Sequence, residues 1–342
     1  ILNSYRRAKK YHRLKNGDFI RMEDETLKEL SNFMELMHAD PKDFVEGDMQ
    51  IPAYRALYLD KLLEKNDGLY GKRDSHFKHL IKEFKTVSDS EYEIPESLQG
   101  IVRSYQEFGY KWLRTIESYR FGGILADDMG LGKTLQVIAL LTAFYQEKTE
   151  QKAAGNEGGG AELPLPSLIV CPASLVYNWQ KEISRFAPQI KTTLVTGLAA
   201  ERQRIVRHTK EGEVLITSYD LLKRDVELYR DMVFAIQVID EAQYIKNPGT
   251  QAAKGVKQIT AGFKLALTGT PIENRLSELW SIFDYLMPGF LYTYQRFREE
   301  IEIPIVVNGD ENRMQRLQRM IRPFILRRLK GEVLRDLPAK LE

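Results

Sequence analysis

A glycine-rich stretch of the chain has the residue types that bind phosphate groups. Residues 130–134 read Gly-Leu-Gly-Lys-Thr, after a short apolar run and before apolar residues at helical spacing. Glycines let backbone N–H groups surround a phosphate, and the start of the next helix adds the positive end of its dipole. We expect the Lys133 ammonium to reach the β- and γ-phosphates of a nucleotide and the Thr134 hydroxyl to ligate Mg²⁺. The general pattern GxxxxGK would place glycine at 127, where this chain has Asp127.

Two adjacent carboxylates, Asp240 and Glu241, stand directly after a second apolar run. Ligands of doubly wound parallel sheets bind beyond the carboxyl ends of the strands, so the pair should face the same crevice as the glycine-rich loop. We expect Asp240 to bind Mg²⁺, usually through a water, and Glu241 to orient or deprotonate the attacking water. An isolated Asp-Glu pair is also typical of a solvated helix cap. Together with the loop, the pair predicts hydrolysis of ATP.

Short apolar runs that alternate with helical patterns must position these residues. The predicted strands beyond residue 100 are 123–126, 168–171, 193–195, 214–217, 236–239 and 265–268. This alternation predicts an α/β fold in which helices cover both faces of a parallel sheet. Residues 151–166, which include Gly-Gly-Gly at 158–160, predict a flexible surface insertion.

The N-terminal part of the chain has a different pattern. Residues 11–20 predict a hairpin that turns at Asn16-Gly17. Apolar residues at helical spacing predict further helices around 27–37, 54–62 and 77–84. The polar stretch 88–97 is interpreted as a linker. We therefore expect a small, mostly helical module over 1–97 and a second domain over 98–342.

The composition excludes several classes of protein. Of the 342 residues, 43% are hydrophobic and 29% are charged, which excludes disorder throughout. The apolar runs are far shorter than the roughly 18 residues of a membrane-spanning helix. Cys171 is the one cysteine, so an internal disulfide and a multi-cysteine metal site are excluded. With 50 Lys and Arg against 48 Asp and Glu, the net charge of +2 argues neither for nor against nucleic acid.

From about residue 98 to its end, the chain resembles the Snf2 family of DNA translocases within helicase superfamily 2. Residues 127–134 (DDMGLGKT) resemble that family's phosphate loop, which explains Asp127, although the family usually has Asp-Glu in place of Asp127-Asp128. Further segments match in order: RSYQEFGYKWL at 103–113, CPASL at 171–175, TSYD at 217–220, DEAQ at 240–243, LTGTPIEN at 267–274 and RPFILRR at 322–328. The resemblance implies a RecA-like lobe over 98–342, and residues 1–97 resemble the accessory region of bacterial Snf2-like proteins.

The resemblance also implies roles for single residues. Gln106 stands at the adenine-reading position, and Thr268, Thr270 and Gln243 would couple the phosphate site to the DNA-facing surface. The implied nucleotide-binding residues are Gln106, Asp127, Met129, Gly130, Leu131, Gly132, Lys133 and Thr134.

Contacts to DNA phosphates are implied for Ser174, Ser218 and Tyr219, although hydroxyls at strand ends can instead cap the next helix. Trp179 is interpreted as a core residue rather than a base-stacking platform. Residues 1–21 hold seven Lys and Arg against one acid, and this basic arm either binds DNA or is a solvated surface.

The family's second RecA-like lobe would begin where this chain ends. That lobe carries an arginine that stabilises the transition state, and such an arginine is worth about 10³ to 10⁵ in rate. We therefore expect the 342 residues to bind ATP·Mg²⁺ weakly and to turn it over negligibly. Arg327 and Arg328 are interpreted as a salt-bridged bracing segment rather than as substitutes.

The resemblance implies a DNA-dependent ATPase that uses ATP and Mg²⁺, translocates on double-stranded DNA and remodels protein–DNA complexes. We expect a monomer without a membrane partner, in the cytoplasm of a prokaryote and associated with the nucleoid. The chain begins at Ile1 without a signal peptide, and a start without Met indicates a fragment. Two alternatives stay open: a nucleotide-dependent module that captures a protein through residues 1–97, and a strand-separating helicase for DNA or RNA.

Overall fold

The computed structural model describes residues 11–13, 19–21, 52–65, 74–153, 164–269 and 275–333. By its internal contacts the chain divides into two units, residues 1–81 and 82–342. The boundary expected between residues 97 and 98 stays a prediction. Much of the expected linker is packed: Tyr92 and Ile94 lie against a buried cluster of Leu98, Tyr110, Ala139 and Ala143 in the second unit.

The first unit contains the strands of the predicted hairpin and two of the three predicted helices, the second of which extends past the unit boundary at residue 81. Strands β1 (Tyr11–Arg13) and β2 (Phe19–Arg21) pair antiparallel, with His12 opposite Ile20. Helix α4 (Ala56–Lys65) and helix α5 (Ser75–Lys85) confirm two of the predicted amphipathic helices. The helix expected at 27–37 and the Asn16-Gly17 turn lie outside the described residues.

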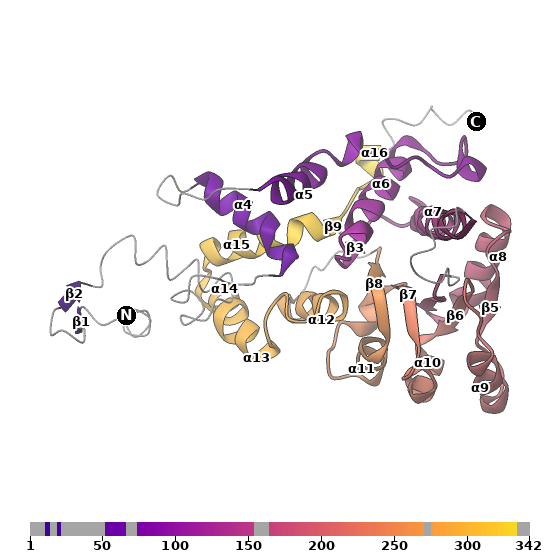
Figure 1. Ribbon diagram of the computed structural model, residues 1–342. Helices are drawn as coiled ribbons and strands as arrows, with labels where there is room; N and C mark the ends of the chain where they lie inside the picture. The colour runs from indigo at the N-terminus through magenta and orange to yellow at the C-terminus, as the bar shows by residue number, and fades with distance from the viewer. Residues whose placement is uncertain are drawn as a thin grey trace. The chain divides into compact units, whose positions relative to one another are not determined.

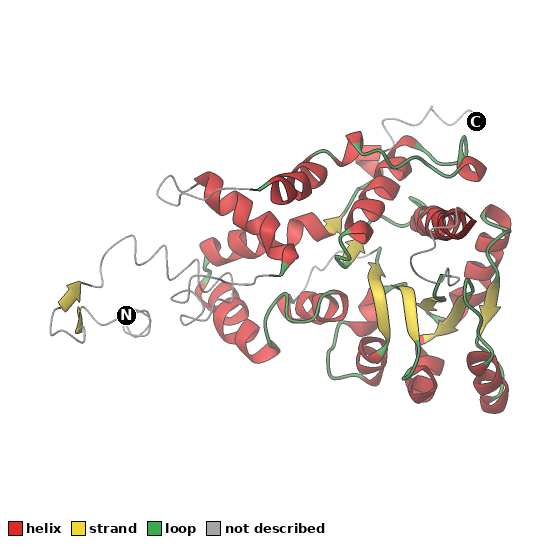
Figure 2. Cartoon of the chain, in the orientation of Figure 1, coloured by secondary structure: helices red, strands yellow, loops and turns green. Residues whose placement is uncertain are grey.

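The second unit is built on a parallel sheet. Within the described residues, seven strands hydrogen-bond in the order β5-β6-β4-β7-β8-β3-β9 (Figures 1 and 2). Six of them confirm the predicted strands: β3 (Gly123–Leu125), β4 (Ser167–Cys171), β5 (Thr192–Leu194), β6 (Val214–Ser218), β7 (Val233–Ile239) and β8 (Thr260–Leu267). Every residue of β4 and β6 is buried, as expected for central strands covered on both faces.

Helices cover this sheet on both sides (Figure 1). Helices α6 (Ser104–Ser118), α7 (Lys133–Ala153) and α8 (Val176–Phe186) pack against one another in series on one face. Helices α10 (Tyr219–Asp225), α11 (Gln251–Gln258) and α12 (Leu276–Leu286) do so on the other, and α9 (Ala199–Arg207) follows β5. The predicted α/β fold is confirmed.

The short strand β9 (Ile325–Leu326) was not predicted, and neither were the helices between α12 and β9. These are α13 (Tyr294–Phe297), α14 (Ile303–Asn308) and α15 (Glu311–Ile321), and α16 (Lys330–Val333) follows β9. Strand β9 returns to the sheet edge and pairs with β3, with Ile325 opposite Ile124. Residues 325–333 therefore run beside the loop that leaves β3.

The expected insertion at 151–166 is described at its two ends. Helix α7 continues to Ala153, while the carbonyls of Pro164 and Pro166 accept hydrogen bonds from the amides of Gly212 and Ala235, 2.6 and 2.8 Å away. Residues 154–163 lie outside the described chain. Among the described helices, none combines the length and the apolar character that crossing a membrane requires.

Candidate nucleotide-binding site

The loop between β3 and α7 has the conformation that its glycines predict. Gly130 and Gly132 have φ angles of +86° and +75°, a region that other residues rarely adopt. A side chain at Gly132 would lie 2.3 Å from the Gln106 amide nitrogen, so the loop also requires glycine for space. Because α7 begins at Lys133, its first N–H groups have no partner within the helix and are available to an anion.

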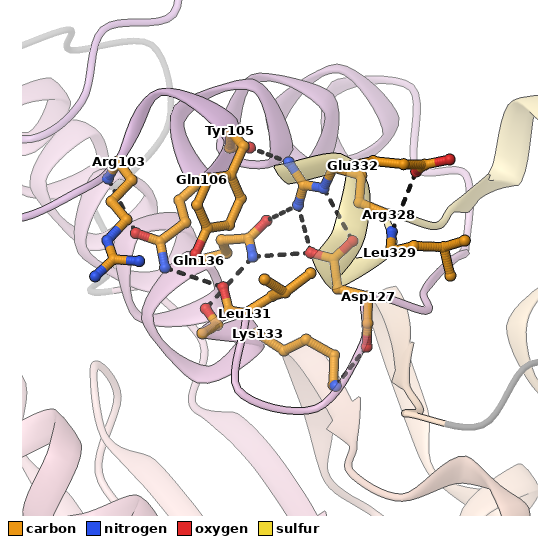
Figure 3. Close-up of polar contacts among 11 residues, drawn as sticks. Arg103, Tyr105, Gln106, Asp127, Leu131, Lys133, Gln136, Arg328, Leu329 and Glu332 are labelled. Carbon is orange, nitrogen blue, oxygen red and sulfur yellow. Dashed lines mark hydrogen bonds and ion pairs between the residues drawn. The ribbon is translucent and has the colours of Figure 1, made fainter. Parts of the chain in front are cut away.

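The Gln106 side chain holds this loop from behind. Its amide nitrogen donates to the carbonyl of Leu131 at 3.0 Å, and its amide oxygen accepts the backbone N–H of Arg103 at 3.0 Å (Figure 3). The side chain is buried, with 5% of the residue exposed. The adenine-reading role stays a prediction, while the contact with the loop is one that the sequence did not predict.

Lys133 is the cation predicted to bind the phosphates. Its ammonium donates to the carbonyl of Asp127 at 2.7 Å, at the start of the loop (Figure 3). Burial lowers its pKa, and the negative charges of Glu241 and Asp240, among others, oppose that effect. The lysine and the two acids predicted to act with it therefore lie within electrostatic reach of one another.

Asp240 and Glu241 follow β7 as predicted. Asp240 is 8% exposed; one carboxylate oxygen accepts the Trp179 indole N–H at 2.9 Å, and the other accepts the Glu241 backbone N–H at 2.9 Å. Burial raises the pKa of the Asp240 carboxyl, and the hydrogen bond from Trp179 opposes the rise. Glu241 has a φ of +54°, a strained value for a residue with a side chain, at the point where the chain turns away from the sheet.

Gln243 joins the acids to the end of β8. Its amide nitrogen donates to a carboxylate oxygen of Glu241 at 2.7 Å, and its amide oxygen accepts the Thr268 hydroxyl at 3.4 Å. Gly269, which follows Thr268, lies close to the phosphate loop: a side chain there would come within 2.9 Å of Met129. Gln243 thus joins Glu241 to Thr268 by hydrogen bonds, whereas Thr270 lies outside the described residues. The coupling role of all three stays a prediction.

The three residues expected at DNA differ in exposure. Ser174 is exposed in the short turn before α8. Ser218 is buried and caps α10, accepting the Leu221 amide, while the Tyr219 hydroxyl donates to the Asp240 carbonyl at 2.8 Å. The capping alternative is thus confirmed for Ser218. Contact with DNA stays a prediction for all three.

Trp179 and Arg328 contribute to the site in ways that sequence reasoning missed. Trp179 is 1% exposed, which confirms the core interpretation, yet its indole N–H also fixes Asp240. Arg328 forms a salt bridge with the buried carboxylate of Asp127, which confirms the bracing interpretation for that arginine (Figure 3). That carboxylate is 0% exposed and points behind the loop, so only the Asp127 backbone is placed toward Lys133.

The residues of this site fit a nucleotide triphosphate with Mg²⁺. The loop supplies two glycines in the left-handed conformation and a lysine, which suit phosphate oxygens. The Thr134 hydroxyl and the Asp240 carboxylate are oxygen donors, the type that Mg²⁺ prefers. Met129, also expected at the nucleotide, is 61% exposed.

Comparison with known proteins gives the family. Residues 105–342 match the model of the SNF2-related domain, and residues 1–95 match the bacterial SNF2 helicase-associated region. The SWI2/SNF2 ATPase core of Sulfolobus solfataricus, solved in complex with double-stranded DNA, is 37% identical with a TM-score of 0.60, over 72% of this chain and 49% of that one.

Two relatives, one from a bacterium and one from Homo sapiens, are similar to this chain over part of their length. The putative ATP-dependent helicase/translocase YwqA of Bacillus subtilis is 32% identical over 95% of this chain and 35% of its own length. TATA-binding protein-associated factor 172 of Homo sapiens is 37% identical over 79% of this chain and 15% of its own length. The chain thus spans about a third or less of these relatives. Its motifs, its sheet and these matches agree: the chain belongs to the SNF2 family and has the RecA-like fold found in that family's ATPase core.

Proposed function

We propose that residues 98–342 are the ATP-binding first motor lobe of a DNA-dependent ATPase that translocates on double-stranded DNA and remodels protein–DNA complexes. The observation that carries this proposal is the approach of the phosphate loop to the ends of β7 and β8. A side chain at Gly269 would lie 3.6 Å from the Lys133 ammonium, and the preceding residue, Thr268, is joined by hydrogen bonds through Gln243 to Glu241. A half-buried cation, together with a buried and a half-buried acid that follow a parallel strand, suits a triphosphate and its metal.

Each charged group has one task in this proposal. Lys133 binds the β- and γ-phosphates, and Thr134 and Asp240 hold Mg²⁺. The metal, when bound, neutralises charge that develops on the phosphate oxygens. Glu241 orients the attacking water and accepts its proton, and Gln243 fixes the Glu241 carboxylate from 2.7 Å away.

Coupling to DNA follows the link from Glu241 through Gln243 to Thr268. A change at the γ-phosphate alters what Glu241 contacts, and the hydrogen bonds of Gln243 pass that change to the end of β8. We propose that Thr270 continues this path. The archaeal relative solved with double-stranded DNA supports a duplex as the partner, and exposed Ser174 is the best supported of the three phosphate contacts.

Residues 1–97 are proposed to bind a protein partner in a nucleoid-associated setting. Support comes from the match to the bacterial SNF2 helicase-associated region, and from relatives whose names associate them with the TATA-binding protein. We further propose that residues 1–342 act as a monomer and, alone, turn ATP over at a negligible rate, because the arginine of a second lobe is needed.

The test compares ATP hydrolysis by the full-length native protein with duplex DNA, single-stranded DNA and RNA, together with a strand-separation assay. We expect the duplex to stimulate hydrolysis most, without strand separation. Equal stimulation by RNA, or release of a strand, would favour the helicase alternative. Nucleotide binding without hydrolysis under any condition would favour the binding module. The 342-residue chain is measured in parallel, and DNA-stimulated turnover by it would contradict the proposed inactivity.

A further inference from the structure

We propose that Arg328 is a positioning residue of the phosphate-binding loop, and that through it ATP bound at the loop orders residues 325–333. This inference rests on the proposed function. Beyond that function, it assigns a role to Arg328, which lies about 195 positions after Lys133 in the sequence. It also predicts that residues 325–333 respond to ATP. Neither point follows from the motif of the loop.

The guanidinium of Arg328 contacts three elements at once (Figure 3). Its Nε donates to Oδ1 of Asp127 at 2.9 Å, and Nη2 donates to Oδ2 of the same carboxylate and to Oε1 of Gln136, the latter at 2.7 Å. Nη1 donates to the carbonyl of Tyr105 on α6. The arginine side chain is 13% exposed and the carboxylate 0%, so this is a buried, two-pronged ion pair.

The backbone of the same segment runs along the loop. The Ala126 amide donates to the Leu326 carbonyl at 2.7 Å, and the Asp128 amide donates to the Arg328 carbonyl at 3.1 Å. In return, the Lys330 amide donates to the Asp128 carboxylate at 3.0 Å. Residues 126–128 and 326–330 are therefore held side by side, and the Arg328 guanidinium links this pair of segments to α6 and α7.

Gly109 gives an independent sign that this arrangement is built into the fold. It lies inside α6, where glycine is less favourable than alanine. A side chain there would lie 1.8 Å from Oε1 of Gln136 and 2.8 Å from Nη2 of Arg328. The helix thus leaves open the space that these two polar groups occupy.

The path from Arg328 to the nucleotide passes through two residues, Asp127 and Lys133. Arg328 fixes the carboxylate of Asp127, and the carbonyl of Asp127 accepts the Lys133 ammonium. Without the guanidinium, a fully buried carboxylate would lose its cation and would draw Lys133 away from the phosphates. A purely structural brace would stabilise the fold without making residues 325–333 respond to ATP.

Affinity measurements on the 342-residue chain test the positioning role. In titrations with ATP·Mg²⁺ up to millimolar concentration, we expect Arg328→Gln to weaken binding about tenfold or more, the usual range for loss of an orienting group. Arg328→Lys keeps the charge but not the two-pronged contact, so its ATP affinity should lie between those of the unaltered chain and Arg328→Gln. Adding Asp127→Asn to Arg328→Gln should restore part of the affinity, because it removes the buried charge. The exposed Arg319→Gln on α15 is the matched control. Unchanged affinity in Arg328→Gln would overturn the proposal.

Hydrogen exchange with and without saturating ATP·Mg²⁺ separates positioning from bracing. We expect ATP to slow exchange at 123–134 and at 325–333 in the unaltered chain, and only at 123–134 in Arg328→Gln. Should that variant fail to fold, Gly109→Ala must give the same pattern, because its methyl group would displace Gln136 and press on the same guanidinium. If 123–134 responds but 325–333 does not, this inference fails alone; if neither segment responds, the proposed function fails with it.

Discussion

The phosphate-binding loop separates two groups of charged residues that differ in how far other residues of the protein neutralise them. On its front face, Lys133, Asp240 and Glu241 are charged groups whose burial shifts the pKa of Lys133 down and that of Asp240 up, toward their neutral forms. On its back face, Asp127 receives donors from both Arg328 and Gln136. The back face is satisfied by the protein itself. The front face retains charge that a ligand can use.

This difference indicates which part of the site performs chemistry and which part holds it in place. A lysine that donates to a carbonyl rather than to a carboxylate keeps its charge for phosphates. A buried carboxylate that already binds an arginine has little left for a metal. The two faces therefore predict different responses to substitution: losses of turnover or ligand affinity at the front, and losses of preorganisation at the back.

The largest expected effect is at Glu241, and it sharpens the comparison by separating chemistry from binding. Glu241→Gln removes the proton acceptor but keeps the shape, so ATP hydrolysis by the full-length native protein should fall about 10²- to 10⁴-fold. ATP affinity should stay within about twofold, since the phosphates contact Lys133 and the loop. Steady-state turnover and equilibrium ATP binding measure the two effects. Equal loss of both would assign Glu241 to binding instead.

Lys133→Ala should produce the next largest effect, and here affinity falls as well. The variant loses a charged donor to the phosphates, which is worth about 10²- to 10³-fold in turnover when the donor acts on the transferring group. Since the lysine pKa is lowered, the ammonium form is lost at a lower pH than for a free lysine, so ATP affinity in the unaltered chain should decline earlier on the alkaline side. The exposed Lys254→Ala on α11 is the control. If both variants bind ATP equally well, Lys133 is not the phosphate ligand.

Trp179→Phe tests whether the front face depends on orientation, and its expected effect is smaller. The ring remains in the core, but Asp240 loses the indole donor 2.9 Å away, and its pKa should rise further. Loss of a group that orients a metal ligand costs about tenfold in metal affinity. The Mg²⁺ concentration needed for ATP binding should therefore rise, most of all at low pH.

The matched control for that variant is Trp280→Phe, which also removes an indole hydrogen bond, to the Tyr292 carbonyl at 3.0 Å, away from the loop. It should lower stability without changing the Mg²⁺ requirement. The same Mg²⁺ shift in both variants would mean that loosening of the core, rather than Asp240, is responsible.

The local elements of the front face could be predicted from the sequence, whereas the contacts of the back face could not. A glycine-rich loop, an Asp-Glu pair and strand-helix alternation have fixed local signatures, so the six strands were predicted correctly, as were the places of Lys133 at the start of a helix and of Asp240 after a strand. The roles of these two residues stay predictions. The back face depends on β9, two residues long, and on an arginine 201 positions from its carboxylate partner. No local pattern specifies a pairing at that separation.

The buried polar contacts of Trp179 show the same limit on a smaller scale. Its helical spacing predicted a core residue, and its exposure of 1% agrees. Helical spacing reports which face of a helix is buried, but not which polar atom the indole N–H will meet. That atom is set by the packing of α8 beside the end of β7, which is a property of the tertiary structure.

Asp240→Asn should give the smallest effect, a change in stability in the absence of ligand. The opposite change would contradict the comparison between the two faces. Burial raises the pKa of the Asp240 carboxyl, so the folded chain binds a proton there more readily than the unfolded chain does. The ionised carboxylate therefore costs stability that grows as the pH rises above the ordinary carboxyl range. Asparagine removes that cost, and we expect the melting temperature at neutral pH to rise by a few degrees, about 1 kcal/mol. Asp127→Asn, on the back face, should lower the melting temperature instead, because Arg328 loses its carboxylate. Thermal melts of the two variants with no nucleotide present make the comparison directly. Melting temperatures that shift in opposite directions support a front face whose charge is neutralised by a ligand, and shifts in the same direction contradict it.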